Sequence, residues 1–296
     1  MGCKLSTLLE KKEKTNSPGE LAALAAAFRL EMFDVLYRRQ TGHWGGSSSA
    51  AELVTSLYFN RLNIRPEEPQ WVDRDRFILS KGHASINLYT VLAYRGFFPP
   101  SELPGFRTLG SMLQGHPNMR ATPGVDFSTG ALGHGVSAAA GMALAARVQG
   151  RSYSTYVMTG EGCLDEGQTW EALLFAAKYK LRGLVLMVDY NKVQLDGPSE
   201  EILPLEPLCD KISAFGWHLA PNTFNGHDTG EILASFNWLD SDDVWPKAVI
   251  YNTVKGKGVS FMEGKSAWHG APIDDASYKE GRAELAADAA GKEAAL

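Results

Sequence analysis

Histidine beside glycine is the most unusual pattern in this sequence, and it points to proton chemistry. Five of the seven histidines directly follow a glycine, and a sixth directly precedes one. Glycine permits tight turns on which backbone and imidazole can both approach a ligand, and imidazole titrates near neutral pH. A single such histidine is more often a turn residue bonded to nearby backbone, but six together favour a binding or catalytic site. They are His43, His83, His116, His134, His227 and His269.

Two polar side chains and a backbone carbonyl indicate a metal site. Glu161 lies in a Gly-Glu-Gly tripeptide directly after one predicted strand, and Asn191 lies just past the next strand along the chain. In a parallel sheet both positions fall at the carboxyl edge, where open α/β sheets bind ligands. With a carbonyl near Val193 they could hold a hard cation such as Mg²⁺, whose remaining positions a diphosphate would fill. Gly162 would let its N–H approach that phosphate at a helix N-terminus.

A glycine-rich turn indicates a surface for a flat ligand. Residues 128–135 contain three glycines and a histidine, and a helix of small residues is expected over 136–146. Close packing of that helix accounts for its alanines. It does not account for the turn, whose glycines expose backbone groups.

Strands that alternate with helices are expected to position these groups. The pattern predicts an α/β fold in which a parallel sheet carries helices on both faces. The clearest helices are expected from Pro18 onward and over about 166–181. The expected strands are Arg76–Leu79, Thr155–Thr159, Leu184–Val188 and Ala248–Asn252, with a weaker one at Trp217–Ala220.

Length and composition exclude several classes of protein. The 296 residues are expected to form one domain at 18–285, preceded by a polar extension at 1–17 and followed by an alanine-rich tail at 286–296. With 29 basic against 34 acidic residues the net charge is −5, so we expect no nucleic-acid partner. No apolar run approaches the ~20 residues that cross a bilayer, so we expect no membrane partner. Three scattered cysteines fit a reducing cytoplasm.

Ten short motifs, in this order along the chain, resemble transketolase. The resemblance extends over roughly Pro18 to Leu285 and concerns the N-terminal, diphosphate-binding domain of thiamine diphosphate enzymes, as it occurs in split transketolases made of two chains. The motifs are Gly42–Ser47, Asp73–Phe77, Ser80–Ala84, Gly115–Pro117, Ser128–Gly135, Gly160–Gly167, Asp189–Asn191, Gly226–Asp228, Thr253–Gly258 and Ala267–Pro272.

The resemblance implies a role for each candidate site residue. Mg²⁺, or Ca²⁺ or Mn²⁺ in its place, would be held by Glu161, Asn191 and the Val193 carbonyl. The histidines that would line the substrate channel and move protons are His43, His83, His116 and His269. The residues that would contact thiamine diphosphate or its metal are Lys81, His83, Gly130, Leu132, Glu161, Gly162, Asn191, Lys255 and His269.

The resemblance also implies a partner. In the family, the glutamate that activates the aminopyrimidine and the residues that grip a sugar phosphate come from a separate pyrimidine-binding domain. We therefore expect this chain to be inactive alone and to work with a C-terminal transketolase subunit, in an α₂β₂ assembly. Together they would transfer a two-carbon ketol unit from a ketose or ketose phosphate donor to an aldehyde acceptor.

Two other functions share part of this pattern. The α-type subunit of a 2-oxo acid dehydrogenase uses the same cofactor and metal motif, but the contexts of His43 and His269 look like transketolase. A degenerate homologue that only scaffolds a partner is a third hypothesis. Glu161, which replaces the family's usual aspartate, gives it slight support, whereas the intact set of histidines argues against it.

Glu161 also generates a testable prediction. Its side chain is one methylene longer than aspartate, and Mg²⁺ demands near-ideal octahedral geometry. We expect Glu161→Asp to tighten Mg²⁺ binding about tenfold relative to Ca²⁺, as measured by metal titration in the presence of thiamine diphosphate. Unchanged affinities for metal and cofactor would show that the longer side chain has no effect.

Overall fold

A six-stranded sheet with parallel pairing forms the centre of the computed structural model, which describes residues 3–241 and 244–296. The strands are ordered β1-β2-β3-β6-β4, and β5 also pairs with β6. The parallel α/β fold is thus confirmed, and all five predicted strands lie within two residues of their expected limits, whereas β5 was not predicted. The strands are β1 (Arg76–Leu79), β2 (Thr155–Thr159), β3 (Leu184–Tyr190), β4 (His218–Leu219), β5 (Phe224–Asn225) and β6 (Lys247–Asn252).

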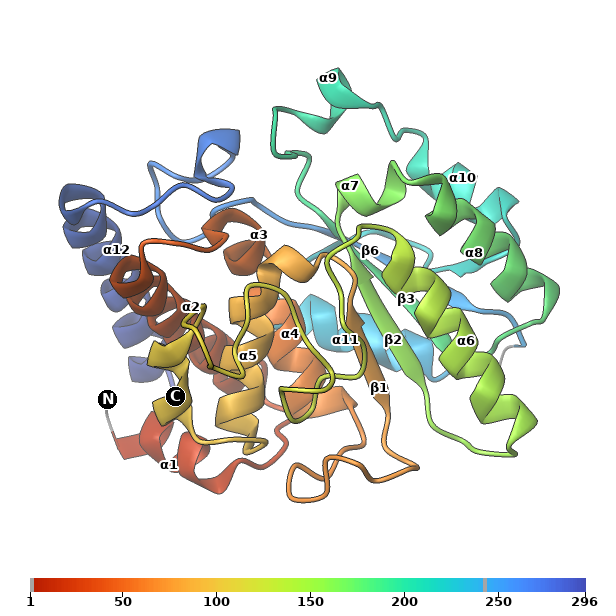
Figure 1. The fold of residues 1–296 in the computed structure, drawn as a ribbon, viewed down its shortest axis with the longest axis horizontal. Coiled ribbons are helices and arrows are strands. Elements are labelled where there is room, and N and C mark those ends of the chain that lie inside the picture. The colour runs from red at the N-terminus through yellow and green to blue at the C-terminus, as the bar shows by residue number, and fades with distance from the viewer. Residues whose placement is uncertain (1–2, 242–243) are drawn as a thin grey trace.

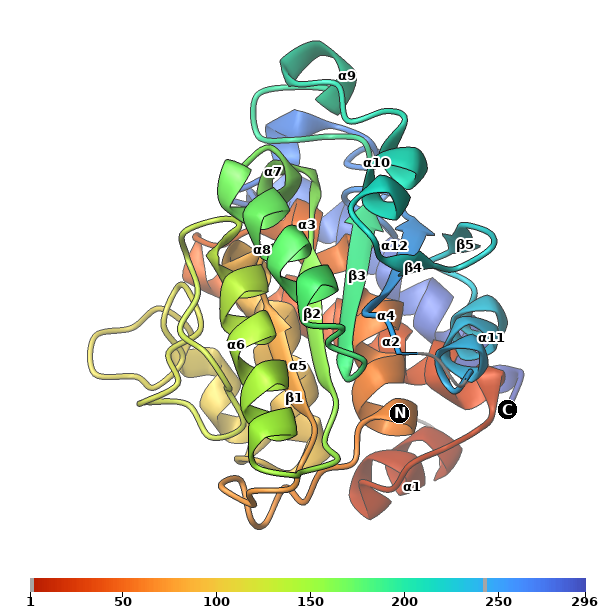
Figure 2. The same ribbon diagram turned by 90° about the vertical axis from the view of Figure 1, so that its right-hand side faces the viewer.

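Helices cover both faces of the sheet, as Figures 1 and 2 show. Side chains alternate along each strand, so that Phe77 and Leu79 of β1 pack into one core and Ile78 into the other. The core that contains Ile78 is closed by α6 (His134–Val148), α8 (Gly167–Lys178) and α10 (Leu208–Ala214). The larger core is closed by α2 (Pro18–Arg39), α4 (Ala51–Ser56), α5 (Ser85–Arg95), α11 (Thr229–Leu239) and α12 (Asp275–Ala294).

Short helices lie where the chain turns at the carboxyl ends of the strands. They are α3 (Trp44–Ser49), α7 (Glu161–Leu164) and α9 (Ser199–Ile202), with 3₁₀ turns at Gly82–Ala84 and Ser266–Trp268. Figure 1 shows α7 and α9 above this edge of the sheet. Single turns of this kind leave backbone groups available at that edge.

The two ends of the chain pack onto the domain. The helix predicted from Pro18 begins there as α2, where the Ser17 hydroxyl accepts a hydrogen bond from the Glu20 N–H. Within the expected extension at 1–17, residues 1–2 lie outside the described part, whereas α1 (Cys3–Lys11) buries Leu5 in the larger core. At the other end, α12 crosses residue 285 without interruption. Among the described residues, no helix is both long and apolar enough to cross a membrane.

A buried ion network joins α2 and α4 to the loop before α11. Arg29 donates from Nη2 to Glu52 Oε2 at 2.6 Å, and both side chains are almost fully buried. His227 Nδ1 lies 3.0 Å from the same carboxylate, while its Nε2 accepts the Val254 N–H at 2.8 Å. Burial alone would raise the pKa of Glu52, but Arg29 and His227 outweigh it and hold that pKa well below its usual range. His227 thus has a structural role on the loop before α11, and it does not belong to the set of site histidines.

Glu52→Gln tests this network. The substitution leaves the Arg29 guanidinium buried without its counter-charge, so we expect the free energy of unfolding to fall by about 3–5 kcal/mol at neutral pH, as measured in denaturant. Because the pKa of Glu52 is lowered, its contribution is complete at neutral pH and is lost as the pH falls below the ordinary value of 4.5. The stability difference between wild type and variant should therefore shrink in acid.

The matched control is Glu68→Gln. Glu68 pairs with Arg65 at the surface, where the two side chains are 56% and 48% exposed. Solvent screens such a pair, so the same chemical change should leave the unfolding midpoint almost unmoved. Equal losses in the two variants would contradict a special role for the buried network.

Candidate active site

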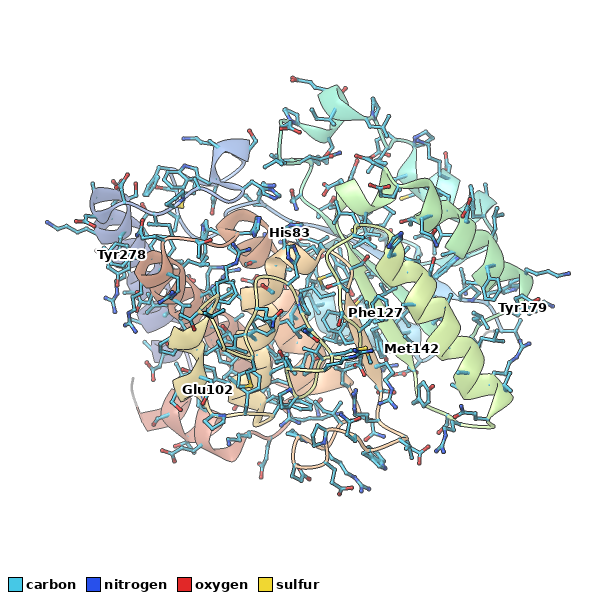
Figure 3. The ribbon with its side chains drawn as sticks, in the orientation of Figure 1. His83, Glu102, Phe127, Met142, Tyr179 and Tyr278 are labelled. Atoms are coloured by element: carbon cyan, nitrogen blue, oxygen red, sulfur yellow. The ribbon has the colours of Figure 1, made fainter. Side chains whose placement is uncertain are left out.

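One cavity at the carboxyl edge of the sheet gathers most of the predicted site residues. It encloses about 160 Å³. Figure 3 shows one of its residues, His83, beside α3 near the ends of the strands. The residues that line the cavity are Gly46, Lys81, His83, Leu132, Gly160, Glu161, Gly162, Cys163, Asn191, Val193, Gln194, Leu195, Lys255 and His269.

Three predicted residues lie beside the cavity rather than in its wall. The His43 ring centroid is 5.3 Å from that of His83, 5.3 Å from that of His269 and 6.4 Å from that of His116. A Cβ on Gly130 would lie 3.7 Å from the His116 ring. The structure therefore brings all the predicted residues into one neighbourhood, although they come from distant parts of the sequence.

The Asp189 carboxylate ties together the segments that carry the site. It accepts hydrogen bonds from the Lys81 ammonium, from Ser49 Oγ at 2.6 Å and from Thr253 Oγ1. Lys81 also donates to the Gly46 carbonyl at 2.6 Å. Burial alone would raise the pKa of Asp189, but Lys81 outweighs it and lowers the pKa. The ammonium of Lys81 is thus held by protein oxygens at the base of the cavity.

The three oxygens of the predicted metal site come from residues that line the cavity. Glu161 Oε1 accepts the Lys192 N–H, and Asn191 Oδ1 accepts the Val193 N–H at 3.2 Å. The Val193 carbonyl accepts a hydrogen bond from the Lys255 ammonium at 3.0 Å. Many metal sites in proteins use three or more His, Cys, Asp or Glu side chains, and the described residues contain no such group. The predicted site differs, because it combines one carboxylate with an amide oxygen and a backbone carbonyl. The set nevertheless consists of the oxygen donors that hard cations prefer.

The electrostatics of Glu161 favour a positive ligand. Burial, together with the nearby Asp189 charge, raises the pKa of Glu161 to about 7. Burial disfavours the negative charge of a carboxylate, and a nearby cation stabilises that charge. The donor set and this carboxylate therefore fit a divalent metal.

The histidines around the cavity are neutral at physiological pH. Burial, reinforced by Arg107, lowers the pKa of His43 to about 4, and burial, reinforced by Lys255, lowers that of His269 to about 3. Burial and Lys81 bring the pKa of His83 well below its ordinary value. Neutral imidazoles can donate from one ring nitrogen and accept at the other, so each can serve substrate oxygens without carrying charge.

Glycines bring the backbone of α3 close to the site. A Cβ on Gly46 would lie 2.9 Å from His83 Nε2, and a Cβ on Gly45 would lie 3.0 Å from the Lys255 side chain. Any larger residue would force these groups to move. The short glycine-serine helix α3 is therefore part of the site as well as of the packing.

A larger cavity at the opposite edge of the sheet has a different character. It encloses about 510 Å³ and is rich in arginine and lysine. Arg147 donates to the Tyr179 carbonyl at the end of α8, and Lys247 donates to the Leu239 and Ser241 carbonyls at the end of α11. Cations are expected there because helices end with negative dipoles, so these charges serve the fold.

Comparison with known proteins decides which family this site represents. The family model described as "Transketolase, thiamine diphosphate binding domain" matches residues 21–292. The chain belongs to the transketolase family. The resemblance seen in the sequence is thereby confirmed, and the cavity lies in a thiamine diphosphate-binding domain.

Curated relatives include subunits of split enzymes. The 6-deoxy-6-sulfo-D-fructose transketolase subunit SqwG of Clostridium sp. (strain MSTE9) is 45% identical over 82% of this chain and 88% of its own length. An apulose-4-phosphate transketolase subunit of Phocaeicola vulgatus is 38% identical over 87% of this chain and 90% of its own length. The chain is therefore the thiamine diphosphate-binding subunit of a two-subunit transketolase, which is a transferase, as the sequence analysis predicted.

A solved transketolase supports the fold. The enzyme from Campylobacter jejuni superposes with a TM-score of 0.84 at 28% identity, over 92% of this chain but only 45% of its own chain. The chain thus spans about half the length of that enzyme.

Sequence reasoning missed several residues that shape the site. Asp189 falls within one of the transketolase-like motifs without an expected role, although an aspartate inside the apolar strand β3 is a signal of its own. Gly46 likewise lies in a motif without an expected role. Arg107, which lies 3.4 Å from His43 Nδ1, carries no sequence signal because only the folded loop brings it there.

Gly46→Ala tests the close approach of α3. The added methyl would force His83 to move, and a buried ring in a packed site cannot shift without loss of its contacts. We expect thiamine diphosphate affinity to fall about tenfold, the equivalent of about 1.4 kcal/mol, as measured by calorimetric titration with Mg²⁺ present.

Gly141→Ala is the matched control on α6. A Cβ there meets nothing within 4 Å, so helix propensity alone should stabilise the fold slightly. Cofactor affinity should stay at the wild-type value. If Gly46→Ala also bound the cofactor normally, the glycine would have no part in the site.

Proposed function

We propose that this subunit binds thiamine diphosphate together with Mg²⁺ and, with a second subunit, transfers a two-carbon ketol unit. The observation that carries the proposal is the arrangement of the cavity: Glu161, Asn191 and the Val193 carbonyl share its wall with His83 and His269. Metal-type oxygen donors and neutral imidazoles thus meet in one place. A diphosphate held by the first group would bring its attached ligand to the second.

The residues of the chain divide into binding and proton-handling groups in this proposal. The metal would be held by Glu161, Asn191 and the Val193 carbonyl, with Ca²⁺ or Mn²⁺ as substitutes. Lys81 and Lys255 would supply positive charge near the diphosphate, and Gly162 would offer its N–H. Backbone groups of the turn that contains Gly130 and Leu132 would face the aminopyrimidine. When bound, thiamine diphosphate supplies the carbanion that cuts a ketose beside its carbonyl.

The histidines would act on the sugar. His83 and His269 lie in the wall of the cavity, with His43 and His116 beside them, and the pKa of each is lowered first of all by burial. As neutral rings they would donate hydrogen bonds to hydroxyl and carbonyl oxygens and carry protons as the bond breaks and reforms. A ketose or ketose phosphate as donor and an aldehyde as acceptor fit this set.

A partner subunit would complete the site. Among the described residues that line the cavity, Glu161 is the only carboxylate, and its oxygens are assigned above to the metal. The glutamate that activates the aminopyrimidine would come from a pyrimidine-binding domain on a second chain, in an α₂β₂ assembly. The two curated relatives named above are themselves subunits. A reducing cytoplasmic location fits the free thiols of Cys163 and Cys209.

Reconstitution tests this function. The tagged chain would be isolated from its own cells, and the protein that accompanies it in equal amount would be identified by mass spectrometry. We expect a chain with a pyrimidine-binding domain, and ketol transfer only when both chains, thiamine diphosphate and Mg²⁺ are combined. Native mass spectrometry should then give two copies of each chain.

The other outcomes distinguish the competing functions. Full ketol transfer by this chain alone would overturn the split active site. A lipoyl-bearing partner, with reductive transfer to the lipoyl group, would favour a 2-oxo acid dehydrogenase. A partner without any cofactor binding would favour a scaffold.

A further inference from the structure

Arg107 is held beside His43 by contacts of its backbone and side chain. The loop backbone takes the left-handed conformation at Arg107, with φ of 58°, and the Arg107 N–H donates to the Leu113 carbonyl at 2.8 Å. The guanidinium donates from Nη1 to Thr41 Oγ1 at 2.8 Å. A Cβ on Gly115 would lie 2.9 Å from Arg107 Nε, so the absence of a side chain there makes room for the guanidinium.

In the hydrogen bond between Arg107 and His43, only Arg107 can be the donor. Arg107 Nη2 lies 3.4 Å from His43 Nδ1. Guanidinium nitrogens only donate hydrogen bonds, and a neutral imidazole has one donor and one acceptor nitrogen. Nδ1 must therefore be the acceptor, and the proton of the neutral ring must be on Nε2. The Nε2 side of the ring faces Gly270, where a Cβ would lie 3.4 Å away.

His269, which faces His43, is fixed in the same way. Its Nδ1 lies 2.8 Å from the Lys255 ammonium, which also lies 3.0 Å and 3.2 Å from the carbonyl oxygens of Val193 and Gln194. Three acceptors meet the three protons of one ammonium, so His269 Nδ1 also accepts. Two neighbouring imidazoles thus each receive a cationic donor on Nδ1.

We propose that Arg107 is a positioning residue that holds His43 in the Nε2–H tautomer, so that His43 presents a hydrogen-bond donor to the substrate. The role in substrate binding rests on the proposed function, whereas the tautomer does not. Burial lowers the pKa of His43, and Arg107, His116 and Lys255 lower it further, which keeps the ring neutral. His43 would then donate to a hydroxyl or carbonyl oxygen of the sugar and would not act as a base through Nδ1.

Nitrogen NMR of the full chain tests the tautomer directly. With ¹⁵N-labelled histidine, a two-bond proton–nitrogen correlation spectrum distinguishes a protonated ring nitrogen from a bare one, and His43→Gln assigns the signals of His43. At neutral pH we expect wild-type His43 to carry its proton on Nε2. In Arg107→Met a fraction of the Nδ1–H form should appear.

Arg120→Met is the matched control. Arg120 lies on an exposed turn after His116, and its substitution removes the same charge without touching His43, so its spectrum should equal that of wild type. An Nδ1–H tautomer or an imidazolium in the wild type would overturn the proposal, even if Arg107→Met failed to fold. So would a folded Arg107→Met variant whose His43 signals equal those of wild type.

A double-mutant cycle tests the catalytic consequence in the reconstituted enzyme. If Arg107 acts through His43, Arg107→Met should lower kcat/KM about tenfold in the wild-type background but less than about twofold in the His43→Gln background. Equal losses in the two backgrounds would overturn the positioning role. If no combination of chains transfers a ketol unit, the proposed function fails, while the NMR result still decides the tautomer.

Discussion

The buried carboxylate of Asp189 is the constraint on which the site depends. It accepts hydrogen bonds from Ser49 at the end of α3, from Lys81 after β1 and from Thr253 after β6, and it belongs to β3 itself. A buried charge of this kind is tolerated only when its partners are complete. The loops at the carboxyl edge are therefore fixed relative to one another by a single group, and the cavity forms where they meet.

A second buried network supports the same edge from the larger core. Glu52 holds both Arg29 and His227, and His227 accepts the Val254 N–H, next to Lys255. Because Lys255 then reaches the Val193 carbonyl and His269, the position of its ammonium follows from a chain of contacts that starts in that core. The residues that keep buried charges paired in the core therefore also position the groups that face the ligand.

The sequence allowed the sheet and most of the site to be predicted because both leave local signals. Buried parallel strands are apolar runs, and the glycines that precede five of the histidines mark loops and turns. The two-residue strand β5 was missed because its neighbours are polar residues and glycine, whereas the equally short β4 lies between Trp217 and Ala220 in a more apolar run. The role of Arg107 was missed for another reason. Its contact with His43 joins residues 64 positions apart and depends on a loop conformation that no local sequence pattern encodes.

The cations of the site have two effects, one on ligand binding and one on the histidines. Lys255 and Arg107 bring positive charge to this edge, and Lys81 adds a third cation that is already paired with Asp189, which together favour a diphosphate. The same charges, after burial itself, lower the pKa values of His43, His83 and His269. Anion binding and neutral imidazoles are therefore consequences of one arrangement. A negative ligand would weaken the second effect, but burial is the largest cause of the lowered pKa of all three rings, so they would remain neutral donors when substrate arrives.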